Sequence, residues 1–110
     1  MFGGKRRGTK YSSVKVEVDG IKFASKKEAR RYAELKLLVS AGAIRDLQLQ
    51  VTYRCEVNGV KVCDYRADFV YVRVRDGAEV VEDVKGFRTD VYKLKKRLMA
   101  ACNGIEIKEV

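Results

Sequence analysis

The sequence predicts an α/β fold of the α+β kind, in which a mixed β-sheet is flanked by two main helices. Turn signals are the first reason, because Asp-Gly or Asn-Gly pairs separate strand-like segments at residues 19–20, 58–59 and 76–77. Helical periodicity is the second reason, since two segments repeat apolar residues every three or four positions and follow capping residues. The predicted order is β-β-α-β-β-β-β-α-β, in a single domain over residues 14–110.

The start of the chain is predicted to be a basic arm followed by a hairpin. Residues 1–13 mix glycine and serine with lysine and arginine, which is typical of a flexible basic arm. Residues 14–18 and 21–24 are expected to pair as two strands. No apolar segment follows the basic start, so it is not a secretory signal, and we expect a cytoplasmic location.

A first helix is expected from Ser25 to Ala41, where Gly42 ends it. Ser25 and Glu28 have the spacing of a capping box, in which the acid accepts a hydrogen bond at the helix start. The helical wheel places Glu28 on the side that faces the sheet. Two readings of Glu28 therefore stand side by side: a capping residue, or a carboxylate directed toward a site on the sheet.

The remaining elements follow the same rules. We expect strands over 47–57 and 60–65, a central hairpin over 66–84, a helix over 91–102 capped by Thr89 or Asp90, and a strand over 105–110. A two-residue loop at 58–59 would leave Cys55 and Cys63 on opposite faces, so reduced thiols are favoured over a disulfide.

The central hairpin gathers charged groups on one face. A type I′ turn at residues 76–77 places Asp68 opposite Lys85 and Val70 opposite Asp83. Side chains two residues apart share a face, so both aspartates and the lysine point the same way, among valines. Ionised groups rarely lie on an apolar face without a function, although cross-strand Asp–Lys pairs also occur on exposed surfaces.

These groups suit a divalent cation and phosphodiester hydrolysis. Mg²⁺ prefers hard oxygen ligands, which Asp68, Asp83 and the carbonyl of Val84 can provide, with Mn²⁺ as a substitute. Lys85 would stabilise the phosphorane or orient the attacking water. Strand parity places Glu82 on the opposite face, so we expect it to be a surface residue or the partner of a basic side chain.

Charge points to a nucleic-acid partner. The 110-residue chain has 24 Lys and Arg against 15 Asp and Glu, a net charge of +9, and it has no histidine, which excludes His-dependent nucleophilic systems and His-ligated zinc. A merely soluble basic surface is the alternative. The candidate DNA contacts are Lys5, Arg6, Arg7 and Lys10 in the arm, Lys26, Lys27 and Arg30 in the first helix, Gln50 in the strand that follows it, and Lys93 and Lys96 in the second helix.

The arrangement of Asp68 and Asp83-Val84-Lys85, preceded by a helical Glu28, resembles the PD-(D/E)XK nuclease superfamily. The similarity extends over most of the chain, in the strings DGIKFASKKEARRYAELKLL, LQLQ, ADFVY and VVEDVKGFRTDVYKLKKRL. It is similar to small phage-encoded endonucleases related to Holliday-junction resolvases. Ala67 replaces the proline of the motif, a position that carries no catalytic group.

The resemblance implies a restriction-endonuclease-like core, dependence on Mg²⁺ or Mn²⁺, and a homodimer that cuts branched DNA, with no role at a membrane. It also implies roles for individual residues: Glu28, Asp68 and Asp83 match metal-site acids, Lys85 matches the motif lysine, and Gln50 matches a glutamine near the site in some members. Two alternatives remain, a nicking or flap endonuclease of phage replication or packaging, and a basic nucleic-acid-binding module without catalysis.

Overall fold

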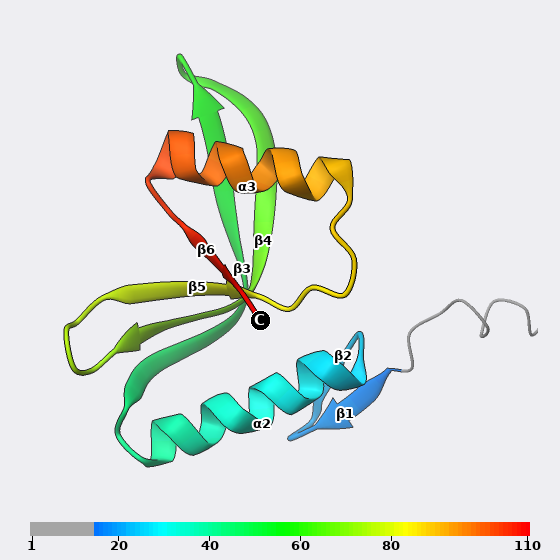
Figure 1. Cartoon of the computed structure of the whole chain (residues 1–110), viewed down its shortest axis with the longest axis vertical. Coiled ribbons are helices and arrows are strands. Elements are labelled where there is room, and N and C mark those ends of the chain that lie inside the picture. The colour runs from blue at the N-terminus through cyan, green and yellow to red at the C-terminus, as the bar shows by residue number, and fades with distance from the viewer. Residues whose placement is uncertain (1–14) are drawn as a thin grey trace, which may run out of the picture. The chain divides into compact units, whose positions relative to one another are not determined.

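The computed structural model describes residues 15–110, which fall into two compact units, one ending at Lys36 and the other running from Leu37 to Val110 (Figure 1). The predicted basic arm and its four candidate DNA contacts, Lys5, Arg6, Arg7 and Lys10, lie outside the described residues, and the single domain over 14–110 stays a prediction. Within residues 15–110, neither helix is long and apolar enough to cross a bilayer.

The first unit contains a short hairpin and the start of a helix. Strands β1 (Val16–Val18) and β2 (Ile21–Phe23) pair antiparallel around Asp19-Gly20, as predicted. Both turn residues have positive φ, 54° and 75°, which is the conformation that Asp-Gly turns supply at low cost. The Tyr32 hydroxyl donates a hydrogen bond to Asp19 at 2.9 Å, and the Tyr32 ring lies against Phe23, which ties the helix to the hairpin.

Helix α2 (Lys26–Ser40) begins at the predicted cap. The Ser25 hydroxyl accepts a hydrogen bond from the Glu28 N–H at 3.1 Å, and the Glu28 carboxylate accepts one from the Ala24 N–H at 2.9 Å. These two bonds satisfy donors that a helix start leaves open. Helix α2 and the turn that contains Gly42 therefore agree with the sequence prediction.

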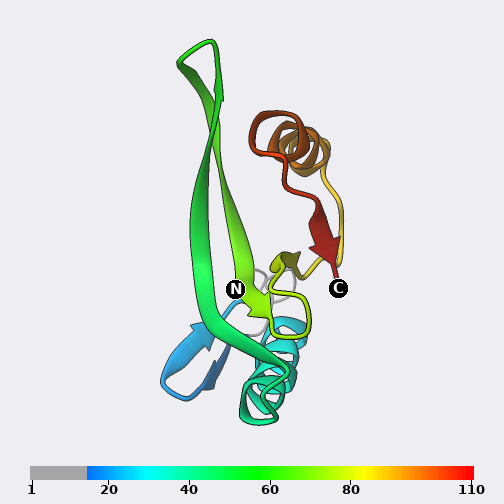
Figure 2. The same ribbon diagram turned by 90° about the vertical axis from the view of Figure 1, so that its left-hand side faces the viewer.

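The second unit is built on a four-stranded mixed sheet, as predicted. The strands are β3 (Ile44–Val57), β4 (Val60–Arg73), β5 (Glu79–Asp83) and β6 (Ile107–Glu109). Their order in the sheet is β3-β4-β5-β6; β4 runs antiparallel to both β3 and β5, and β6 runs parallel to β5. Strands β3 and β4 form a long twisted ribbon (Figure 2).

The predicted break between strands at residues 65 and 66 is wrong. Strand β4 is continuous over 14 residues and pairs with β3 along its length and with β5 near its end. No glycine, proline or asparagine interrupts the stretch from Val62 to Arg73, so nothing in the local chemistry ends the strand there. Residues 15–110 therefore contain one strand fewer than predicted, and β4 belongs to both hairpins.

The loop between β4 and β5 is longer than the predicted two-residue turn. The Arg73 N–H donates to the Ala78 carbonyl at 2.8 Å, so residues 74–77 form the loop. The Asp76 carboxylate holds it, because it accepts from the Arg73 guanidinium at 2.8 Å and from the Ala78 N–H at 3.1 Å. The register moves by two residues, an even number, so every side chain keeps its predicted face.

The cysteines also differ from the prediction. A register shift between Cys55 and Glu56 brings Cys55 opposite Cys63, where a regular two-residue hairpin would have kept them on opposite faces. All three cysteines are free thiols, and Cys55 is buried. Burial first, and then the neighbouring Cys63 thiol, raise the pKa of Cys55 to about 11, so Cys55 stays a neutral core residue at neutral pH.

Helix α3 (Asp90–Asn103) covers the hairpin of β3 and β4 (Figures 1 and 2). Thr89 is its N-cap and accepts a hydrogen bond from the Tyr92 N–H at 3.0 Å, while Gly104, with φ 66°, ends it. The helix buries Tyr92 and Met99 against the sheet. They share a core with Cys55, Tyr65, Ala67, Val70, Val81 and Ile107.

Candidate functional site

Asp68 and Asp83 lie side by side on adjacent strands. The antiparallel register of β4 and β5 pairs Phe69 with Glu82, so the next residue along each strand brings Asp68 level with Asp83. The sequence prediction that Asp68 lies opposite Lys85 is wrong by two residues, because the connecting loop is longer. Asp68 and Asp83 still lie on the same face of the sheet, as predicted, but directly opposite each other and therefore closer together than the predicted register placed them.

This pair belongs to a polar row that crosses the sheet. The register of β3 and β4, which pairs Leu49 with Phe69, continues to bring Gln50 level with Asp68, and the Gln50 amide donates to Asp68 Oδ1 at 3.4 Å. On the other side, Asp83 is the register partner of Glu109 in β6. Each of the four strands therefore contributes one polar side chain at the same level.

Gln50 has an unusual backbone for a strand residue. Its φ is 56°, in the left-handed region that non-glycine residues seldom adopt. Such strain costs free energy, and it is concentrated in proteins at sites where it orients a functional group. The weak sequence indication that Gln50 lies near the site is consistent with its contact to Asp68.

The Asp83 carboxyl is buried and its pKa is raised to about 7. Burial disfavours the charged form and is the largest cause, followed by a hydrogen bond shared with Asp68. The Tyr65 hydroxyl donates to Asp83 Oδ2 and acts in the opposite direction. Near neutral pH the two aspartates therefore tend to share a proton.

Lys85 completes the cluster. Its Nζ lies 3.3 Å from Asp83 Oδ2 and 4.2 Å from the centre of the Tyr92 ring, and its side chain is 24% exposed. The aromatic face and the carboxylate together restrict the ammonium to one side of Asp83. The chain after Asp83 is anchored as well, because the Val110 N–H donates to the Asp83 carbonyl at 3.0 Å.

Of the two roles predicted for Glu82, the surface position is wrong and the pairing with a basic side chain is confirmed. Glu82 is fully buried, accepts a hydrogen bond from the Tyr71 hydroxyl, and lies 3.9 Å from the Lys108 ammonium. Its register partner Phe69 is also fully buried. The alternation of side chains along β5 correctly placed Glu82 on the face opposite to Asp83. That face is also buried, so Glu82 and Asp83 are both buried, on opposite sides of the sheet.

Glu28 lies in the first unit. Its carboxylate is buried, 8% exposed, and caps helix α2 through the Ala24 N–H. The capping reading of the sequence is therefore confirmed. Its role as a metal ligand stays a prediction.

The oxygen donors of the second unit fit a hard divalent cation. Residues 15–110 contain no group of three or more His, Cys, Asp or Glu side chains arranged around a metal position. Two carboxylates and the backbone are enough for Mg²⁺, which keeps several waters. The backbone of Val84 lies beside the pair, since its N–H donates to Asp68 Oδ2 at 2.8 Å. A buried carboxyl that must share a proton with its neighbour is a site that a divalent cation would relieve.

A family model described as "Protein of unknown function (DUF1064)" matches residues 8–107. The chain belongs to the DUF1064 family. The match includes Asp68, Asp83 and Lys85. Searches of curated proteins and of solved structures find no match.

The basic residues that the sequence singled out in the DUF1064 protein have different surroundings. Lys26, Lys27 and Arg30 are exposed near the start of α2, in the first unit. Lys93 and Lys96 lie on α3, in the second unit, where Lys96 binds Glu109 at 3.1 Å. Binding of DNA by these side chains stays a prediction.

Three contributors to the site were not found from the sequence of this DUF1064 protein: Tyr65, Arg88 and Glu109. Tyr65 has a detectable signal, because a buried tyrosine needs a partner for its hydroxyl, but nothing local identifies Asp83 as that partner. Glu109 depends on the parallel pairing of β6 with β5, which connects residues across helix α3. Arg88 binds Glu109, so it follows only once that pairing is known.

Proposed function

We propose that this protein is a metal-dependent endonuclease that hydrolyses phosphodiester bonds in DNA. The observation that supports it most is the pairing of Asp68 with the buried Asp83, with the Lys85 ammonium 3.3 Å from Asp83. A buried Asp83 carboxyl with a raised pKa, beside a second carboxylate and a cation, is an expensive arrangement for a purely structural role. The pattern matches the order Asp, then Asp-x-Lys, from which the sequence suggested a nuclease.

Asp68, Asp83 and the Val84 carbonyl would hold Mg²⁺ or Mn²⁺. When bound, the cation supplies charge neutralisation at the phosphate and a bound water of lowered pKa. Loss of the shared proton from Asp83 would accompany binding, since a carboxylate must be ionised to act as a ligand. Tyr65 fixes the direction of the Asp83 carboxylate through its hydroxyl.

Lys85 would stabilise the negative charge that develops on the phosphate oxygens during attack by water. Its ammonium faces Asp83 from one side and the Tyr92 ring from another. A point charge held in position before the reaction requires little reorganisation in the transition state. Gln50, linked to Asp68, would hold the second carboxylate in place.

The proposed substrate is branched DNA, and the proposed active form is a homodimer. The net charge of +9 favours a polyanion, and the resemblance to junction resolvases supplies the preference for a branch. One site cuts one strand, so symmetric paired cuts require two subunits, which twofold symmetry provides.

The decisive experiment is cleavage of a labelled four-way junction with Mg²⁺, with Mn²⁺ and with EDTA, beside a linear duplex of the same sequence. We expect paired, metal-dependent cuts near the branch point. Asp83→Asn should lower the rate by about a thousandfold, because several kcal/mol of charge stabilisation is lost. Asp64→Asn, an exposed residue of the same strand as Asp68, is the matched control and should retain activity.

Each other outcome has a definite meaning. Cuts in linear or flapped DNA, with none at the junction, would support a nuclease activity but reject a resolvase activity, and would identify a nicking or flap endonuclease instead. Tight, salt-dependent binding with no hydrolysis in either metal would reject the nuclease and support a binding module.

A further inference from the structure

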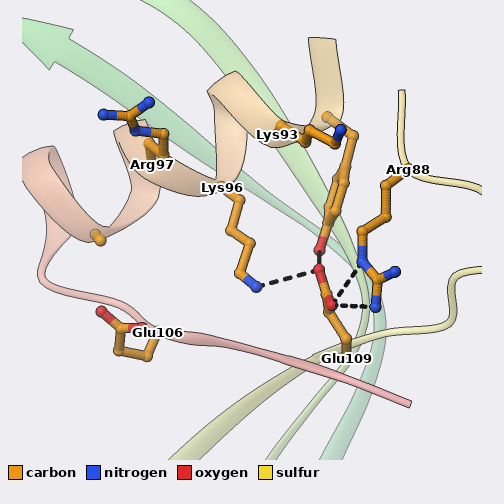
Figure 3. A pocket seen from close by; sticks show the side chains of 8 residues that line it. Arg88, Lys93, Lys96, Arg97, Glu106 and Glu109 are labelled. Atoms are coloured by element: carbon orange, nitrogen blue, oxygen red, sulfur yellow. Dashed lines mark hydrogen bonds and ion pairs between the residues drawn. The ribbon is translucent and has the colours of Figure 1, made fainter. Parts of the chain in front are cut away.

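A cavity of about 410 Å³ lies between helix α3, strand β6 and the loop that precedes α3, all within the second unit (Figure 3). Arg88, Lys93, Lys96 and Arg97 bring four positive charges to its walls, against the two acids Glu106 and Glu109. The lining therefore has an excess of positive charge. Its volume is within the range of protein sites that hold small ligands.

Two of the four cations are held by Glu109. Arg88 binds its Oε1 at 2.8 Å through Nε, and Lys96 binds its Oε2 at 3.1 Å. The pKa of Glu109 is lowered to about 2, mainly by the hydrogen bond from Arg88. Glu109 therefore stays ionised at neutral pH and acts as an internal anion for the cavity.

The other two cations of the lining, Lys93 and Arg97, are not bound to Glu109. Among residues 15–110, neither Lys93 nor Arg97 forms an ion pair, and both side chains are exposed on α3 (Figure 3). Four residues separate them, so they lie on the same face of the helix, one turn apart. Both add positive charge to the helix side of the cavity.

The cavity shares a wall with the proposed active site. The Tyr92 hydroxyl donates to Glu109 Oε2 at 2.8 Å, while the Tyr92 ring lies under the Lys85 ammonium at 4.2 Å. Glu109 is also the register partner of Asp83. The Tyr92 side chain alone therefore links the cavity to Lys85, which belongs to the proposed active site.

We propose that this cavity is a phosphate subsite. It binds a phosphate group of the DNA that neighbours the scissile phosphate. The proposal rests on the proposed nuclease function and adds a location and a set of residues to it. Lys93 and Arg97 make the first contact. Arg88 and Lys96 then release Glu109 and bind the phosphate. Glu109 therefore competes with the phosphate for these two cations and lowers the affinity for DNA.

The alternative assignment of the four cations is a solvated basic surface. Such a surface would bind DNA through overall charge, and the removal of any one lysine or arginine would have a similar small effect. A subsite instead gives unequal effects at charge-matched positions. It also gives a gain of affinity when the internal anion is removed, which a solvated surface predicts only weakly.

The test is binding of fluorescent single-stranded oligonucleotides to the full chain in EDTA, with and without a 5′-phosphate. Lys93→Ala and Arg97→Ala should each weaken binding by about tenfold, because each loses a charge-assisted hydrogen bond. Lys61→Ala is the matched control, since Lys61 is an exposed lysine on β4 outside the cavity. Equal affinities for all three variants would overturn the subsite.

Removal of the internal anion gives the opposite sign. Glu109→Gln keeps the size of the side chain and should tighten binding severalfold, since Arg88 and Lys96 no longer have a charged partner. If this variant unfolds, Glu106→Gln removes the other acid of the lining at an exposed position and should also tighten binding, though less, because Glu106 binds neither Arg88 nor Lys96 among the contacts of the described residues; no gain in either variant would overturn the subsite. Weaker binding by a folded Glu109→Gln would overturn the competition between Glu109 and phosphate.

The two oligonucleotides identify the kind of phosphate. If the 5′-phosphate improves binding and Arg97→Ala removes the improvement, the cavity takes a terminal phosphate monoester. If Arg97→Ala weakens both oligonucleotides equally, it takes an internal phosphodiester. The assay needs no cleavage, so an inactive wild type would reject the nuclease alone, whereas unchanged binding by Arg97→Ala would reject the subsite alone.

Discussion

Asp83 and Glu109 are partners in adjacent strands, yet the structure shifts their pKa values in opposite directions. Burial and the neighbouring Asp68 raise the pKa of Asp83 to about 7, whereas Arg88, Tyr92 and Lys96 lower that of Glu109 to about 2. Within residues 15–110, Asp83 has one nearby cation, Lys85, which does not offset its burial and the Asp68 carboxylate, whereas Glu109 has two, Arg88 and Lys96. The difference indicates which one an external cation would bind, and which one already has its cations from the chain.

The largest expected effect tests the cation on the Asp83 side. Lys85→Ala should lower the rate of DNA cleavage by about a hundredfold to a thousandfold, because a positioned charge at the phosphate is lost. Binding of the same DNA in EDTA should change little, since Lys85 is only 24% exposed. Lys108→Ala, an exposed lysine beside Glu82, serves as the control. Retained cleavage in Lys85→Ala would remove Lys85 from the site.

The second prediction concerns stability without metal. A pKa raised from 3.8 to about 7 means that ionisation of Asp83 opposes folding, so wild-type stability should fall as pH rises from about 4 to about 7. Asp83→Asn removes this cost and should stabilise the metal-free protein by about 2–4 kcal/mol at pH 8, with little gain at pH 4.

Urea unfolding in EDTA at several pH values measures this difference. Mg²⁺ should stabilise the wild type at pH 8 and leave Asp83→Asn unchanged, because binding to the native state alone shifts the equilibrium. If Asp83→Asn is instead destabilised equally at pH 4 and pH 8, Asp83 is already ionised in the metal-free native protein, and the prediction is wrong.

The third prediction concerns Tyr65. Its hydroxyl donates to Asp83 and stabilises the ionised form, so Tyr65→Phe should raise the pKa of Asp83 further. The pH at which half of the Mg²⁺-dependent activity appears should move up by about one unit. A pH–rate profile of both proteins checks this. An unchanged midpoint with a lower maximum rate would assign Tyr65 to packing alone.

The smallest effect is expected on the Glu109 side. The lowered pKa of Glu109 means that its contribution to stability is present above about 4.5 and is lost as pH falls toward 2. Glu109→Gln should therefore cost less than about 1 kcal/mol at neutral pH, as partly exposed ion pairs usually do. The gap from wild type should close in acid, as it does for Asp83→Asn, but with the opposite sign, because Glu109→Gln is the less stable protein at neutral pH; thermal unfolding across pH measures it.

The sequence predicted what depends on neighbouring residues. The turn at Asp19-Gly20, the cap at Ser25 and the helix that begins after Thr89 were all correct, because each is determined within a few residues. The shared face of Asp68 and Asp83 was correct for the same reason, since alternation along a strand is local.

The sequence failed where distant groups decide the structure. The Asp76 carboxylate holds a longer loop than the Asp-Gly pair suggested, which moved the register by two residues. The burial of Glu82 depends on what packs on the second face of the sheet, and its hydroxyl partner Tyr71 lies on another strand. Glu109 joins the row only through parallel pairing across α3, which has no signature in its own three-residue strand.

Strand β3 is an edge strand of the four-stranded sheet, and its 14 residues could pair with a strand of another molecule. Asp46 and Gln50 interrupt it with left-handed backbone, and charged side chains such as Arg45 and Arg54 lie along it. A kinked, charged edge is a poor template for intermolecular pairing, so the same Gln50 that contacts Asp68 also helps to keep the protein from aggregating.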